Sequence, residues 1–110
     1  MKSLRDPKRR PTHPGAVLRD DVLPGLGMTQ EAFAGAIGVH RVTLSGLLRE
    51  RRGLTVELAA RIAKALGHSA ESWLRMQEAV DLWALRQQPE RLAAVRQIKP
   101  RRRAVEAAAA

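Results

Sequence analysis

Arginines dominate the side chains that could carry chemistry in this sequence. Arg supplies 16 of the 20 cationic residues and Lys the other four. A guanidinium can bind a phosphate or a carboxylate through two parallel hydrogen bonds. Residues 41–52 carry a charge of +3, from four arginines and one glutamate: Arg41, Arg49, Arg51, Arg52 and Glu50. The sequence therefore predicts a phosphate-binding surface, with a solvated basic surface as the alternative.

The sequence gives little support for catalysis or metal binding. The chain has no cysteine, which excludes disulfides, thiolate metal sites and cysteine nucleophiles. His13, His40 and His68 are scattered, with no carboxylate at metal-ligand spacing, so we expect neither a metal nor a cofactor. Asp20 and Asp21 are interpreted as a solvated helix face, because no base or nucleophile accompanies them. We therefore expect a protein that is not an enzyme.

The net charge of +9 lies mostly at the two ends of the chain. Residues 1–11 and residues 89–110 each sum to +4, whereas residues 12–88 sum to +1. The outermost eleven residues at each end lack apolar periodicity. We expect a basic, flexible N-terminal arm over 1–11, one small folded domain over 12–88 and a basic, flexible tail over 89–110.

The expected location follows from the absence of apolar segments in the sequence. No apolar run approaches the roughly 20 residues that a membrane-spanning helix needs. The N-terminus is basic, but no apolar stretch follows it, unlike a secretory signal. We therefore expect a cytoplasmic protein that does not contact a membrane.

Apolar spacing and helix breakers predict an all-α chain of five helices. Ala and Leu number 18 and 14, against 11 for Val plus Ile, and this balance favours helix over strand. The first helix should begin at Pro14 and end before the breaker-rich residues 24–27. The last helix should end or kink at Pro89. Three of the helices have a capping hydroxyl immediately before them: Thr29, Thr55 and Ser69.

The second and third helices have the spacing of a helix-turn-helix, at about residues 29–49. Ala34 is small where the two helices approach, and Gly38 permits the tight turn between them. Leu44 and Leu47 should bury the inner face of the third helix. Its outer face and first turn are then free to reach base edges in a major groove.

Residues 28–39, continued by Leu44 and Leu47, resemble the helix-turn-helix of phage repressors, the Cro/C1 or XRE class. Further motifs within residues 11–87 are similar to those of HigA-type antitoxins: His13-Pro14-Gly15, Arg52-Gly53-Leu54-Thr55, Ala63-Lys64-Ala65-Leu66-Gly67, Ser69-Ala70-Glu71-Ser72-Trp73-Leu74 and Asp81-Leu82-Trp83. The resemblance implies a five-helix, lambda repressor-like DNA-binding domain. It also implies an antitoxin that neutralises a HigB-like, RelE-class mRNA-cleaving toxin. As a homodimer, such an antitoxin binds double-stranded operator DNA at its own operon's promoter and represses transcription.

The same resemblance implies two sets of DNA contacts. The residues expected at base edges are His40, Arg41, Val42, Ser45 and Gly46. The residues expected at phosphates are Gln30, Thr43, Arg49, Arg51 and Arg52. Arg41 is the leading candidate for a base contact, because an arginine can bond guanine O6 and N7 together.

The chain departs from the family pattern at both ends of the third helix. His40 stands where a small hydroxyl residue is usual, and it should be a poorer N-cap. Arg49-Glu50 stands where Asn-Gly is common, so the helix end should lack its left-handed cap. Gly46 leaves a gap on the reading face, which predicts a thin direct readout there.

A stripe on the fifth helix could be either core or a dimer interface: Trp73, Met76, Val80 and Trp83. Three functions also stay open. The first is the DNA-binding antitoxin, and the second is a stand-alone phage-type repressor without a toxin partner. A basic RNA-binding protein is the third, although all three aromatic residues lie on apolar stripes rather than among the basic residues. A small RelE-like reading frame beside the gene would favour the antitoxin over the stand-alone repressor.

Overall fold

A computed structural model describes residues 9–99, and within this range every regular element is helical. The elements are α1 (Pro14–Val17), the π-helical turn η1 (Leu18–Val22), α2 (Leu23–Leu26), α3 (Gln30–Ile37), α4 (Arg41–Leu48), α5 (Val56–Leu66), α6 (Ala70–Arg86) and the 3-10 turn η2 (Pro89–Leu92). Because α1, η1 and α2 follow one another without a break, they count as one helical segment. The predicted all-α architecture of five helices is therefore confirmed. Residues 1–8 of the predicted arm and 100–110 of the predicted tail lie outside the described residues.

The first helix continues through Pro24, contrary to the prediction that it ends before that residue. The Leu23 N–H donates to the carbonyl of Leu18, five residues back, so the chain makes a π turn just before the proline. Pro24 occupies the first turn of α2, where a missing N–H costs little. The segment ends at Gly27, whose φ of 64° is left-handed. A breaker-rich sequence does not reveal that a wider turn can accommodate the proline.

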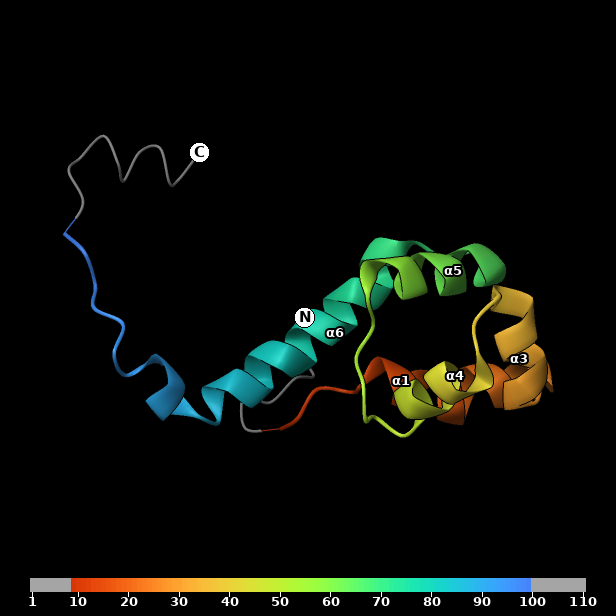
Figure 1. Cartoon of the computed structure of the whole chain (residues 1–110), viewed down its shortest axis with the longest axis horizontal. Helices are drawn as coiled ribbons and strands as arrows, with labels where there is room; N and C mark the ends of the chain where they lie inside the picture. The colour runs from red at the N-terminus through yellow and green to blue at the C-terminus, as the bar shows by residue number, and fades with distance from the viewer. Residues whose placement is uncertain (1–8, 100–110) are drawn as a thin grey trace, which may run out of the picture.

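The core forms where the α1–α2 segment, α3, α4 and α5 meet the first turns of α6. Its fully buried side chains come from each of the first four segments, and Trp73 of α6 is 2% exposed. Figure 1 shows α1 and α4 together in one layer, α5 across from them and α3 closing the end between the layers. The second half of α6 extends beyond the other helices (Figure 1). Leu44 and Leu47 are completely buried, as their spacing predicts.

The predicted helix boundaries between α3 and α6 are confirmed by their caps. Thr29, Thr55 and Ser69 each accept a hydrogen bond from the backbone N–H three residues ahead, at 3.1, 3.1 and 3.2 Å. Gly38 and Gly67 end α3 and α5 in the left-handed region, both with φ of 72°. No helix in the described part of the chain has both the length and the apolar character to cross a membrane.

Candidate nucleic-acid interface

A shallow groove of about 530 Å³ runs between the start of α3 and the exposed face of α4. Its lining residues come from α3, α4 and the turn that follows α4: Gln30, Glu31, Arg41, Val42, Ser45, Gly46, Arg49 and Arg51. Seven of these eight belong to the ten residues that the sequence nominates for DNA contact. Glu31, the eighth, is an acidic residue in the first turn of α3, where its charge complements the helix dipole.

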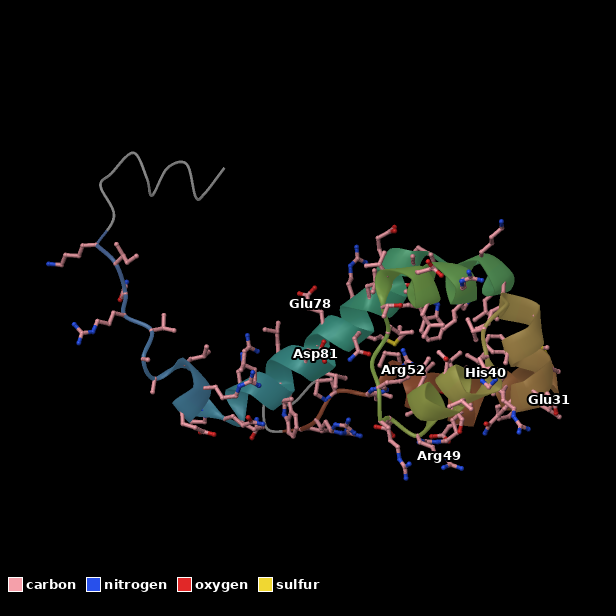
Figure 2. All side chains as sticks on the ribbon, in the orientation of Figure 1. Glu31, His40, Arg49, Arg52, Glu78 and Asp81 are labelled. Atoms are coloured by element: carbon pink, nitrogen blue, oxygen red, sulfur yellow. The ribbon has the colours of Figure 1, made fainter. Side chains whose placement is uncertain are left out.

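The other three nominated residues lie around this groove rather than in its lining. His40 is exposed and immediately precedes α4, and Figure 2 shows it at that end of the helix, with Arg49 at the other. Thr43 is half-buried on the side of α4. Arg52 lies across Gly46: a Cβ added to that glycine would be 3.1 Å from the Arg52 Cδ. The gap predicted at Gly46 is therefore partly occupied by the arginine stem.

His40 does cap α4, although histidine is not among the preferred N-cap residues. Its Nδ1 accepts a hydrogen bond of 3.1 Å from the Val42 N–H, the role that a hydroxyl oxygen has in other caps. When Nδ1 accepts, Nε2 carries the ring's donor hydrogen. The histidine can therefore cap α4 and still donate a hydrogen bond from its exposed edge.

The end of α4 does have a left-handed cap, and the residue that forms it is Glu50. Its φ is 61°, the one positive φ at a non-glycine position within residues 9–99. The Arg51 N–H donates to the Gly46 carbonyl at 2.9 Å, and the Glu50 N–H donates to that of Leu47 at 3.0 Å. These two bonds define a Schellman motif, which glycine usually completes. The prediction that the cap is missing is therefore wrong.

Two arginines hold Glu50 in this conformation. Arg10 Nη1 donates to its Oε1 at 2.7 Å, and Arg19 Nη1 donates to its Oε2 at 3.2 Å. Arg19 also donates to the Leu48 carbonyl at 2.9 Å and pairs with Asp20 at 2.8 Å. The hydrogen bond from Arg10, supported by the one from Arg19, holds the pKa of Glu50 below its ordinary value. In the sequence this anion lies between Arg49 and Arg51, both of which line the groove.

Arg61 of α5 joins the turn between α3 and α4 to the rest of the domain. Its Nη1 donates to the Ile37 carbonyl at 3.0 Å and to the Gly38 carbonyl at 3.4 Å, and its Nε pairs with Glu57 at 3.1 Å. These bonds occupy carbonyl groups that the end of α3 leaves free. Sequence reasoning missed this residue, because its position four residues after Glu57 looks like an ordinary surface ion pair.

The sequence His13-Pro14-Gly15 positions the first helix against α4. The His13 Nδ1 accepts a hydrogen bond of 2.9 Å from the Gly15 N–H and caps the helix, and the histidine is 4% exposed. Burial lowers the pKa of His13, which keeps the ring neutral and Nδ1 available as an acceptor. Gly15 in turn lies directly against the backbone of Leu47. This histidine is thus part of the scaffold under the groove.

The four residues nominated for a dimer interface differ in how much surface they offer. Trp73 and Val80 are 2% and 6% exposed, so they belong to the interior of this chain. Met76 and Trp83 are half-buried, and Met76 packs against the core. The apolar side chains that α6 leaves at the surface are instead near its C-terminal end, where Leu82 is 40% exposed.

A short helix, a left-handed glycine turn and a second helix with a basic outer face define a helix-turn-helix protein of the phage-repressor type. The helix-turn-helix family model matches residues 25–74. Antitoxin HigA-1 of Vibrio cholerae is 45% identical over 83 residues, which cover 76% of this chain and 78% of that protein. The chain therefore belongs to the HigA family of antitoxins.

Solved structures of related antitoxins have the same fold. The antitoxin GraA superposes with a TM-score of 0.76 at 36% identity, over 82% of this chain and 99% of that one. GraA in complex with its operator gives a TM-score of 0.75 at 34% identity, over 89% and 100%. The Pseudomonas aeruginosa antitoxin HigA with the higBA promoter gives 0.73 at 28% identity, over 83% and 100%.

Proposed function

We propose that this protein is an antitoxin that represses its own operon by binding the promoter through the groove on α3 and α4. The observation that carries the proposal is that seven of the residues nominated for DNA contact meet in one open groove. GraA and the Pseudomonas aeruginosa HigA, which share the fold, have been solved with operator or promoter DNA. The proposal assigns no catalytic step and no cofactor to the chain.

The proposed contacts divide along the groove. We assign base edges to Arg41, which is exposed in the first turn of α4, and a thymine methyl to Val42 beside it. We assign phosphates on either side to Gln30 at the start of α3 and to Arg49 and Arg51 beyond α4. Positive charge in the arm and tail adds affinity that does not depend on sequence.

The antitoxin role is separable from the repressor role, and co-expression tests it. We expect the chain to relieve the growth arrest caused by a HigB-like toxin from a neighbouring gene, in the cytoplasm where both proteins act. The alternative is a stand-alone phage-type repressor, which would bind its operator without relieving the arrest. If the chain binds its operator but no RelE-like reading frame lies beside its gene, the repressor role would be supported and the antitoxin role contradicted.

A footprint on the promoter tests the proposed dimer. We expect protection of two half-sites whose centres lie about 34 Å apart, one turn of B-DNA, or a multiple of that distance. Hydroxyl-radical cleavage of the promoter measures the spacing. Inserting five base pairs between the half-sites is the control, because it turns one half-site to the opposite face of the duplex and should weaken binding. Protection of a single half-site, unaffected by the insertion, would argue against a dimer on DNA.

Replacing Glu50 with glycine should raise operator affinity several-fold. The substitution removes an anion next to Arg49 and Arg51 in the sequence, and it frees Arg10 and Arg19 from their ion pairs with Glu50. The stability should stay within about 1 kcal/mol of wild type. Glycine takes a φ of 61° without the left-handed cost of roughly 1 kcal/mol, which offsets the loss of two surface ion pairs. Fluorescence anisotropy and urea unfolding measure the two quantities.

Glu50→Ala is the matched control for this substitution. It removes the same charge but keeps a Cβ in the left-handed conformation, so it should be about 1 kcal/mol less stable than Glu50→Gly. Both variants should bind the operator equally well. An affinity that rises in neither variant would mean that Glu50 does not face the DNA phosphates.

A further inference from the structure

A second groove, of about 410 Å³, runs along α6 and is lined mostly by leucines. Its lining residues are Leu54, Leu74, Gln77, Glu78, Asp81, Leu82 and Leu85. Gln77 is buried, with its Oε1 accepting from the Leu54 N–H and its Nε2 donating to Asp81, both at 2.9 Å. Figure 2 shows Glu78 and Asp81 on the middle of α6. The groove thus combines a fixed polar base, apolar walls and two acidic groups.

The segment after α6 has the opposite character. Leu92, Val95 and Ile98 are 51%, 71% and 80% exposed, and they recur at every third residue. In a chain with three residues per turn, such as a 3-10 or polyproline II helix, this spacing places all three on one edge. The segment already begins with the 3-10 turn η2. The cations of the segment lie on its other edges: Arg91, Arg96 and Lys99.

The groove and the segment match in length as well as in character. Leu74 and Leu85 are eleven residues apart on an α-helix, which corresponds to about 16 Å. Leu92 and Ile98 are six residues apart, which corresponds to about 12–19 Å at three residues per turn. The apolar edge of the segment is therefore long enough to fill the groove along α6. Its flanking cations are complementary to the acidic groups of the groove.

We propose that residues 89–99 of one copy lie in the α6 groove of a second copy, and that the exchange is reciprocal. The segment leads away from the end of its own α6 (Figure 1). Its apolar side chains are exposed, so a second copy can supply the groove that covers them. A twofold arrangement fills both grooves and covers both segments at once. This inference rests on the homodimer of the proposed function and names the surfaces that hold it together.

Two charge reversals test the exchange. Glu78→Lys places a cation in the groove, and Arg96→Glu places an anion on the segment. Each variant alone should dimerise about tenfold more weakly than wild type in sedimentation equilibrium, because like charges then meet at both ends of the dimer. Mixing the two variants should restore wild-type affinity, since the groove of each chain then meets a segment of opposite charge. Restoration on mixing supports an exchange between copies.

Other outcomes overturn the proposal. If each segment folded onto its own α6, a single chain carrying both reversals would regain wild-type dimerisation affinity. Mixing the two single variants would then not restore it. Dimers that none of the reversals weakens would show that a different surface holds the copies together. Operator binding by wild type is measured in parallel; its failure would instead contradict the proposed function.

A pair of valines with equal exposure controls for general surface effects. Val95 and Val56 are both 71% exposed, but Val56 lies at the start of α5, outside the groove and the segment. Val95→Ser should weaken the dimer about tenfold, since the side chain leaves two interfaces per dimer. Val56→Ser should leave it unchanged. Equal effects of the two substitutions would contradict the assignment of the segment.

Discussion

Replacing Arg41 with alanine is expected to remove most of the protein's preference for its operator over unrelated DNA. Arg41 is exposed at the first position of α4 and lines the groove with Gln30. No ion pair holds its guanidinium within residues 9–99, so the fork is free to bond guanine O6 and N7. A bidentate pair of this kind discriminates by about 1–3 kcal/mol, so the specificity ratio should fall roughly 5- to 150-fold.

Competition binding with operator and scrambled duplexes measures this ratio. Arg75→Ala is the matched control, because Arg75 is an exposed arginine on α6, away from the groove. Arg75→Ala removes the same charge as Arg41→Ala. Because Arg75 lies away from the groove, its loss should leave the specificity ratio unchanged. Toxin neutralisation should survive in both variants. An Arg41→Ala protein that keeps its full operator preference would contradict the assignment of α4 as the recognition helix.

Local signals in the sequence were sufficient to predict most of the fold. The hydroxyl caps marked the starts of α3, α5 and α6, and Gly38 marked the end of α3, because each acts on backbone groups within one turn of itself. Pro24 falls outside such local signals: a proline usually ends a helix, and the π turn that accommodates it depends on hydrogen bonds five residues apart. The residue types alone do not reveal that the backbone hydrogen bonds here span five residues instead of four.

The candidate site was predictable as a set of exposed residues on one helix, but not as a set of long-range contacts. Arg10 and Glu50 are 40 residues apart, and Arg61 reaches a carbonyl 24 residues before it. No periodicity in the chain connects such pairs, so the sequence presented Glu50 as a missing cap and Arg61 as a surface charge. Both residues instead hold the ends of the helices that form the groove.

Of the substitutions that we propose, Gly15→Ala is expected to lower the free energy of unfolding the most. A Cβ at this position would overlap the carbonyl oxygen of Leu47 and lie 2.8 Å from its carbonyl carbon. These are backbone atoms on the buried face of α4, so no side chain can rotate to make room. The first helix must move off α4, at a cost of about 2–4 kcal/mol, a large part of the stability of a domain of this size.

Gly35→Ala separates this steric cost from the ordinary effect of replacing a glycine. Gly35 lies inside α3, and apart from its chain neighbours and the backbone of its own helix no atom lies within 4 Å of an added Cβ. Alanine should therefore stabilise the helix by about 0.5–1 kcal/mol. Thermal and urea unfolding of both variants should therefore shift in opposite directions. Because Leu47 belongs to α4, the Gly15→Ala shift should also displace Arg41 and weaken operator binding below the unfolding midpoint. Equal stabilisation by both alanines would show that α1 does not press on α4 in solution, and that the recognition helix is positioned by α3 and α5 alone.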